Sequence, residues 1–477
     1  MNYIKWYQKN WVIFLFLLFF FPVGVVLLWK HSSWRKGVKV LSTILFGIFF
    51  ITIIEGGIIS NYENNKDIYQ RSSPTPQITI TPPPISTAPY DMEKELSKNF
   101  DYVITDDEVK ITKYTGLSIA KEIIIPDGVT VIGEEAFAYR NITERIVVPN
   151  SVKVIERAAF YNCGSLAGIT IPDGVTFIGE RAFYGCHSLT SIKIPEKVTA
   201  IGHGMFNGCW ELTDITIPDS VTSIGANAFE SCWGLTDLPI MNNVTTIGEN
   251  AFQWCHGLTS IVIPNSVTEI SEEMFIMCRN LASVTIPDSV IAIGDSAFRQ
   301  CEALTDISLP DSITTIGSGA FSGCVNLSSI VLPENLTSIG ASVFRKCENL
   351  RSIKIPDNVT SIGDGAFTDC VNLTDVVLPD ELTSIGREAF LNCNRLLEIS
   401  IPDSVTSVGR EAFGCKVNND VRNSYRLSVS YKNEMYTSHY VGYWLADTWI
   451  NGVYIGGVST NLSQYDLPDH FYDLFEP

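Results

Sequence analysis

Cysteine is the residue type in this chain whose number and spacing could support chemistry. The sequence contains 12 cysteines, and thiols can form disulfides, bind metals or act as nucleophiles. Neighbouring cysteines are 23 residues apart, except for the last pair, which is 22 apart. The cysteines are Cys163, Cys186, Cys209, Cys232, Cys255, Cys278, Cys301, Cys324, Cys347, Cys370, Cys393 and Cys415. A fixed period of this size is typical of a solenoid, in which each repeat forms one coil stacked on the last.

Two interpretations of the cysteines compete. Stacked coils would place consecutive cysteine Cα atoms about 5 Å apart, which lies within the range for a disulfide. However, most of the cysteines end an Ala-Phe-x-x-Cys run on the apolar side of the repeat, where a small buried thiol packs well. We therefore expect reduced, buried cysteines and no disulfides. No metal site is expected either, because Cys186-His187 and Cys255-His256 are the only Cys-His neighbours and adjacent side chains do not converge.

The remaining polar residues form no recognised catalytic motif. None of the six histidines lies in a nucleophile or metal motif. The aspartates that follow the prolines are explained by turn chemistry. The net charge of −19 at pH 7 disfavours nucleic acid as a partner, because an acidic surface repels phosphates. The sequence therefore predicts a protein that is not an enzyme and that uses no cofactor.

The apolar pattern of one repeat indicates which elements position these residues. The Leu-x-x-Ile-x-Ile spacing at 212–217 predicts a short strand with one buried face. A second extended segment is expected at 221–224, and Ala-Phe-x-x-Cys predicts a single helical turn. Proline should end the first strand, and only Met241 interrupts that proline column. The glycine after the second segment, such as Gly225, predicts a left-handed backbone.

Stacking would bury the apolar residues of every repeat in continuous internal ladders. A phenylalanine recurs at the same step of 23 residues from Phe137 to Phe413. With parallel strands about 4.8 Å apart, the stack of coils would be roughly 60 Å long.

The repeat closely resembles the BspA-type leucine-rich repeat. The matching runs are Ile-Pro-Asp-Ser-Val-Thr-Ser-Ile-Gly-x-x-Ala-Phe-x-x-Cys at 217–232 and nearly the same sequence at 401–413. The resemblance covers residues 117–415. It implies a repeat solenoid, a right-handed coil of 23-residue units with short parallel strands. It also implies a cell-surface role in adhesion or protein binding, without catalytic residues.

The N-terminal segment predicts a membrane anchor. Residues 1–60 contain two apolar stretches, 11–29 and 40–59, and each is long enough to span a bilayer. The short loop between them is rich in Lys and Arg, which favours the cytoplasmic side and places the rest of the chain outside. Residues 61–90 are rich in Pro, Ser and Thr and are interpreted as an extended linker.

Two modules are expected at the ends of the solenoid. Residues 91–116 are interpreted as an N-terminal β cap, because 100–114 has the pattern of a hairpin. The solenoid is expected at 117–415. Residues 416–477 leave the repeat, alternate in polarity and are rich in Tyr and Trp. They predict a small β-rich module, which is either a cap or a second binding unit.

Two sets of surface residues are candidates for binding. His187, Trp210, Trp233 and His256 directly follow a cysteine in four successive repeats, and Trp254 precedes Cys255. Equivalent positions stack one coil apart, so these rings should form a stripe. Exposed aromatic patches often bind partners, although the rings could instead only seal the edge. The second set is acidic and precedes the first buried residue of a strand: Asp214, Asp237, Asp306 and Asp375. It could hold a basic protein segment or form a merely solvated face.

These features predict a membrane-anchored, surface-displayed leucine-rich-repeat protein that binds a protein or glycan partner. It is expected in the cell membrane as a multi-pass protein, held by residues 11–59, with the repeats outside the cytoplasm. The alternative is a structural or sensory envelope component whose transmembrane helices dock another membrane protein. Glu55 favours this alternative, because charges within membrane spans are often paired.

Overall fold

The computed structural model describes most of the repeat region. The described residues are 91–116, 121–140, 144–240, 242–414, 426–431, 434–439, 445–450 and 453–458. The chain divides into two compact units, residues 1–89 and 90–477, and all described residues belong to the second. The predicted membrane spans at 11–29 and 40–59 and the linker at 61–90 lie outside the described residues. Among the helices that are described, none is long and apolar enough to cross a membrane.

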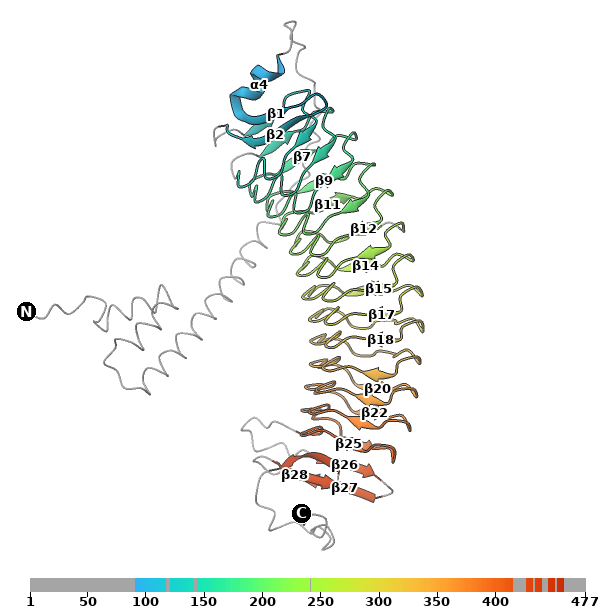
Figure 1. The fold of residues 1–477 in the computed structure, drawn as a ribbon. Helices are drawn as coiled ribbons and strands as arrows, with labels where there is room; N and C mark the ends of the chain where they lie inside the picture. The colour runs from blue at the N-terminus through green and yellow to red at the C-terminus, as the bar shows by residue number, and fades with distance from the viewer. Residues whose placement is uncertain are drawn as a thin grey trace, which may run out of the picture. The chain divides into compact units, whose positions relative to one another are not determined.

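Stacked coils form two ladders of short parallel strands (Figure 1). In the first ladder, β9 (Ser191–Lys193) pairs in register with β11 (Asp214–Thr216). In the second ladder, β10 (Ala200–Ile201) pairs with β12 (Ser223–Ile224). The middle residue of each first-ladder strand is buried or half-buried, and the outer two are accessible in nearly all strands. The predicted parallel-strand solenoid is therefore confirmed.

The two ladders run through the repeats with interruptions. The first ladder also contains β3 (Glu122–Ile124), β5 (Arg145–Val147), β7 (Gly168–Thr170), β14 (Ser260–Val262), β16 (Ser283–Thr285), β20 (Ser352–Lys354), β22 (Asp375–Val377) and β24 (Glu398–Ser400). The second also contains β4 (Val131–Ile132), β6 (Val154–Ile155), β8 (Phe177–Ile178), β13 (Thr246–Ile247), β15 (Glu269–Ile270), β17 (Ala292–Ile293), β18 (Thr315–Ile316), β19 (Ser338–Ile339), β21 (Ser361–Ile362), β23 (Ser384–Ile385) and β25 (Ser407–Val408). Between β16 and β20, a single bridge joins Ser308 and Val331.

The Ala-Phe-x-x-Cys run forms a series of turns, so the predicted helical turn is wrong. The N–H of Phe229 donates to the carbonyl of Ala251 in the next coil (2.8 Å), whereas the N–H of Cys232 donates to Phe229 in its own coil (3.1 Å). Asn227, before the run, and Ser231, within it, have φ values of 56° and 59°, which a right-handed helix does not contain. Bonding between coils satisfies every second N–H, and a helical turn would leave those groups without a partner in the stack.

The glycine after the second strand provides space, so the predicted left-handed backbone at this position is also wrong. Gly225 is not among the residues with positive φ. A Cβ atom at Gly225 would lie 2.7 Å from the backbone nitrogen of His203 in the preceding coil. The same contact at Gly248 would be 2.4 Å, to the nitrogen of Ala226. At Gly225 and Gly248, glycine is required because two backbones approach closely, and the left-handed residue is Asn227, two positions after Gly225.

The phenylalanines form a continuous stack through the core. From Phe137 to Phe413, neighbouring ring centroids are 5.0–5.7 Å apart. The rings from Phe137 to Phe390 are at most 1% exposed. Burying one phenylalanine stabilises the fold by about 1.5–3 kcal/mol, and each ring pair adds about 0.5–1.5 kcal/mol. This stack explains the unbroken phenylalanine period of the sequence.

The cysteines line the same core. The eleven from Cys163 to Cys393 are buried. Each thiol lies 3.0–3.3 Å from the carbonyl of a phenylalanine in the preceding coil and donates a hydrogen bond to it. Burial raises the pKa of Cys255 and of Cys324 to about 12. A thiol with so high a pKa stays protonated at neutral pH and is a poor nucleophile. Cys415 lies outside the described residues.

Additional elements adjoin both ends of the stack. The helix α4 (Met92–Asn99) is capped at its N-terminus by Asp91, whose carboxylate accepts the N–H of Lys94. It precedes the antiparallel pair β1 (Phe100–Ile104) and β2 (Val109–Tyr114). Tyr114 stacks on Phe137 at 5.6 Å and so extends the phenylalanine stack. The sequence pattern did not indicate α4.

The C-terminal strands begin by extending the first ladder. The strand β26 (Arg426–Tyr431) pairs in parallel with β24, and β27 (Glu434–His439) pairs antiparallel with β26. A separate hairpin consists of β28 (Leu445–Ile450) and β29 (Val453–Val458). The rest of 416–477 lies outside the described residues, so the role of this segment stays a prediction.

Candidate functional site

Five rings lie together on one edge of the coil stack, beside the cysteine ladder. We call them the aromatic edge: His187, Trp210, Trp233, Trp254 and His256. The centroids of His187 and Trp210 are 3.8 Å apart, and those of Trp210 and Trp233 are 5.1 Å apart at an interplanar angle of 8°. His256 lies 6.1 Å from Trp233 and 5.9 Å from Trp254. The structure therefore brings together all five aromatic residues that the sequence indicated.

Hydrogen bonds between coils hold the aromatic edge in place. The carbonyl of His187 accepts the N–H of Glu211 at 3.1 Å, and the carbonyl of Trp210 accepts the N–H of Gly234 at 2.8 Å. The Nδ1 atom of His187 also bonds the carbonyl of Gly208 at 2.7 Å. Because the backbones of His187 and Trp210 are tied to a neighbouring coil, this part of the surface is preorganised for contact with a partner.

The stacking decides which part of each ring meets solvent. Trp210 and Trp233 are each 40% exposed, yet their rings are nearly parallel and cover one another's faces. In this pair the accessible area therefore lies mainly at the ring edges. Trp254 is 36% exposed and meets His256 at a tilted angle of 55°. The surface can offer apolar contact and edge-on aromatic packing.

Within the aromatic edge, His256 is the titratable residue whose pKa is shifted. Burial lowers the pKa of His256, and the nearby positive charge of Arg279 lowers it further, while a backbone hydrogen bond with Met277 opposes them. Arg279 in turn forms an ion pair with Glu302, with 3.3 Å between Nε and Oε1. His256 is therefore neutral at pH 7 and contributes an uncharged ring to the surface.

The acidic candidates occupy the same position of their coils, Asp214 in β11 and Asp375 in β22, but do not form one cluster. Asp214, Asp237, Asp306 and Asp375 are all exposed. Asp214 and Asp237 occupy adjacent coils, whereas Asp306 and Asp375 are each three coils further along. Asp214 lines a shallow groove of about 480 Å³, but the other three do not. A binding role for this row stays a prediction.

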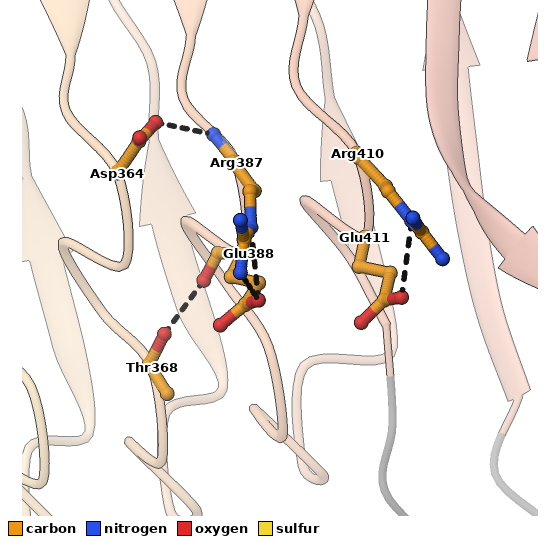
Figure 2. A network of polar contacts seen from close by, with 6 residues as sticks. All are labelled: Asp364, Thr368, Arg387, Glu388, Arg410 and Glu411. Atoms are coloured by element: carbon orange, nitrogen blue, oxygen red, sulfur yellow. Dashed lines mark hydrogen bonds and ion pairs between the residues drawn. The ribbon is translucent and has the colours of Figure 1, made fainter.

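Other charged residues near the C-terminal end of the stack are paired with neighbours. In Figure 2, Asp364 accepts the backbone N–H of Arg387 from the next coil at 2.7 Å. The guanidinium of Arg387 bonds Glu388 at 2.7 Å, and Arg410 pairs with Glu411 at 3.4 Å. Of these contacts, the bond to Asp364 joins neighbouring coils, whereas the two ion pairs lie within single coils. Within the described part of the chain, no three His, Cys, Asp or Glu side chains come together as metal ligands.

Sequence reasoning missed a second group of rings. Tyr161 and Tyr184 stack at 4.8 Å, and Tyr139 meets Tyr161 edge-on at 5.4 Å. Tyr139 is 66% exposed. The signal was present in the sequence, because tyrosine directly follows the ladder phenylalanine in two successive repeats. These rings add to the aromatic surface of the N-terminal half of the solenoid.

Comparisons with known proteins bear on family and fold. The family model described as the BspA type leucine rich repeat region, with six copies, matches residues 111–236, 222–351 and 291–419. A leucine-rich repeat protein from Bacteroides ovatus is 24% identical with a TM-score of 0.53, covering 70% of this chain and 89% of its own. A leucine rich cell surface protein from Faecalibacterium prausnitzii is 29% identical with a TM-score of 0.43, covering 67% and 94%. No curated protein matches the chain. The Bacteroides similarity supports the solenoid fold alone.

Proposed function

The chain belongs to the BspA-type leucine-rich repeat proteins, and from this premise we propose that it is a surface-displayed binding protein without catalytic activity. The observation that carries the proposal is the aromatic edge. Three tryptophans lie within three successive coils, and each keeps 36–40% of its surface exposed. Rings that only sealed the stack would be buried more deeply. Tryptophan is enriched among the residues that dominate binding energy at protein interfaces.

The proposed location is the cell membrane, as a multi-pass protein with the repeats outside the cytoplasm. The support comes from the two apolar stretches at 11–29 and 40–59 and from the basic loop between them. The segment at 61–90 would serve as the stalk. Labelling intact cells with a membrane-impermeant amine reagent tests this orientation. Lysines of 91–477 should be modified, and labelling that needs permeabilised cells would reverse the orientation.

The proposed partner is a protein or a glycan. The whole chain has a net charge of −19, while residues 1–60 contain six Lys or Arg and one Glu. The remainder therefore has a net charge of −24, and this acidic surface disfavours nucleic acid.

The binding test uses cells that display the full-length chain and arrays of immobilised proteins and glycans. The variant Trp210→Ser/Trp233→Ser removes the centre of the aromatic edge. The matched control, Glu348→Ser/Val371→Ser, changes the same repeat position in later coils. We expect wild-type and control cells to bind the same array components and the tryptophan variant to lose them. Equal binding by all three would show that the aromatic edge is structural.

A further inference from the structure

Eleven cysteines form a continuous column of thiols in the core of the stack. From Cys163 to Cys393 they follow one another at one coil each, and every one is a free cysteine that is at most 1% exposed. Each thiol donates its hydrogen to the carbonyl of the phenylalanine in the preceding coil, as Cys186 does to Phe160 at 3.2 Å. The same carbonyl accepts the N–H of Cys163, also at 3.2 Å. The thiol hydrogens therefore belong to the regular bonding between coils.

The core around this column has no space for an oxidised cysteine. A mixed disulfide adds a second group to the sulfur, yet the phenylalanines of the same coils, such as Phe160 and Phe183, are completely buried. Adding atoms to a packed core is destabilising, because side chains and backbone must shift to accommodate them. A sulfur in a disulfide also lacks the hydrogen that the phenylalanine carbonyl accepts. Oxidation at one coil would therefore disturb both its packing and its bonding to the preceding coil.

A disulfide between neighbouring coils also conflicts with the spacing of the stack. Coils that stack in register repeat at about 4.8 Å, the separation of parallel strands, whereas a disulfide draws two Cβ atoms to about 3.5–4.5 Å. Each sulfur can pair with only one neighbour, so disulfides would pull the coils together in pairs. In contrast, the phenylalanine rings from Phe137 to Phe413 are evenly spaced, with centroids 5.0–5.7 Å apart. The even spacing therefore fits reduced cysteines.

The reactivity of these thiols is confined to the unfolded chain. Burial raises the pKa of Cys255 and of Cys324 to about 12, so the folded protein has almost no thiolate, the form that attacks a disulfide. In the unfolded chain the same side chains meet solvent, where a cysteine has a pKa of about 8.5. About a quarter of such thiols are ionised at pH 8. A small disulfide therefore reacts with the unfolded chain much faster than with the stack.

We propose that the solenoid folds only while its cysteine column is reduced, so that a low-molecular-weight disulfide met before folding keeps the chain unfolded. A thiolate of the unfolded chain attacks one sulfur of the disulfide, whose S–S bond breaks, and a mixed disulfide forms while one small thiolate leaves. A thiolate of another repeat then displaces the second small thiolate and forms a disulfide within the chain. Two cysteines are oxidised, and the small disulfide is reduced to two thiols. The folded stack resists the same reagent.

This redox dependence does not rest on the proposed binding function, and it adds a condition to the proposed location. Oxidising conditions outside cells favour disulfides. Repeats that lie outside the cytoplasm must therefore complete their folding before an oxidant reaches them, or remain in reducing surroundings. Once the stack has formed, burial keeps the column reduced.

The test varies only the order in which folding and oxidation occur. Full-length protein in detergent micelles is unfolded in urea with reductant, which is then removed, and is refolded with reduced glutathione or with glutathione disulfide. In a third sample, glutathione disulfide is added after refolding. The urea unfolding transition in far-UV circular dichroism gives the native yield, and peptide mass spectrometry locates each adduct. The matched control, Ser260→Cys, adds a thiol at an exposed position of β14 and shows that the reagent modifies accessible thiols of the folded protein.

We expect glutathione disulfide to lower the native yield at least about tenfold when it is present during refolding, because the modified chain cannot form the stack. When it is added after refolding, it should leave Cys163 to Cys393 unmodified while it reacts at position 260 of Ser260→Cys. Equal native yields with the two forms of glutathione would overturn the inference. Adducts on the column in protein that keeps its native transition would overturn it as well.

A second measurement needs no refolding. Native protein held at the midpoint of its urea transition unfolds repeatedly, so glutathione disulfide should deplete the native signal at least about tenfold faster than reduced glutathione does. Equal rates of loss would overturn the inference, whatever the refolding yields.

Discussion

Phe298 lies in the middle of the phenylalanine stack, and its replacement by alanine should strongly destabilise the solenoid. The ring is completely buried and stacks on Phe275 and on Phe321, each at 5.4 Å. Removing a buried phenylalanine side chain costs about 3–5 kcal/mol. Within that cost, the two lost ring pairs account for about 1–3 kcal/mol, at about 0.5–1.5 kcal/mol each. Phe298→Leu keeps most of the apolar volume and should therefore lose about 1–3 kcal/mol.

The assay is denaturant-induced unfolding followed by far-UV circular dichroism. Phe413→Ala is the matched control, because Phe413 ends the stack, is 7% exposed and stacks on Phe390. Its unfolding free energy should fall by less than that of Phe298→Ala. Because each coil contacts only its neighbours, Phe298→Ala should also broaden or split the transition. A loss below about 1 kcal/mol for Phe298→Ala, or an equal loss for both variants, would refute the stacked core.

Two further predictions concern protonation. Because burial raises the pKa of Cys255 and Cys324 to about 12, only about one such thiol in ten thousand is ionised at pH 8. The native protein should therefore react slowly with a thiol reagent and fully in denaturant, and rapid native labelling would contradict the buried ladder. The pKa of His256 is lowered, so the unfolded chain takes up a proton that the folded chain resists as pH falls below about 6.5. The Tm should then drop with acidification, and His256→Gln should reduce that drop. Identical Tm–pH profiles for wild type and His256→Gln would argue against a lowered pKa of His256.

The period of the sequence predicted the stack but not the course of each turn. A constant step of 23 residues requires equivalent positions to align, so the ladders of Phe, Cys and Ile followed directly. The turns could not be predicted in this way, because the alternation of bonds within and between coils depends on contact with the next coil. Gly225 illustrates the limit, since glycine can serve either a positive φ or a close backbone contact.

For the candidate site, the sequence predicted which rings lie together but not the backbone conformation that holds them. The four rings that follow a cysteine could be aligned by counting, and the structure places them together. The left-handed conformation of Trp254, with φ of 62°, could not be anticipated, because tryptophan itself disfavours the left-handed region that the coil imposes. The acidic row was selected for its position in the strand segment, and only Asp214 and Asp237 lie in adjacent coils.

The central claim is that the aromatic edge is the surface that meets a partner. Oxidative footprinting with mass spectrometry tests this claim directly, because it measures how strongly each tryptophan is oxidised. The free full-length protein is compared with the protein bound to a ligand identified on the protein and glycan arrays. Binding should protect Trp210, Trp233 and Trp254 from oxidation and leave Tyr residues of the C-terminal strands unchanged. Equal oxidation of the three tryptophans in the free and bound protein would contradict the account.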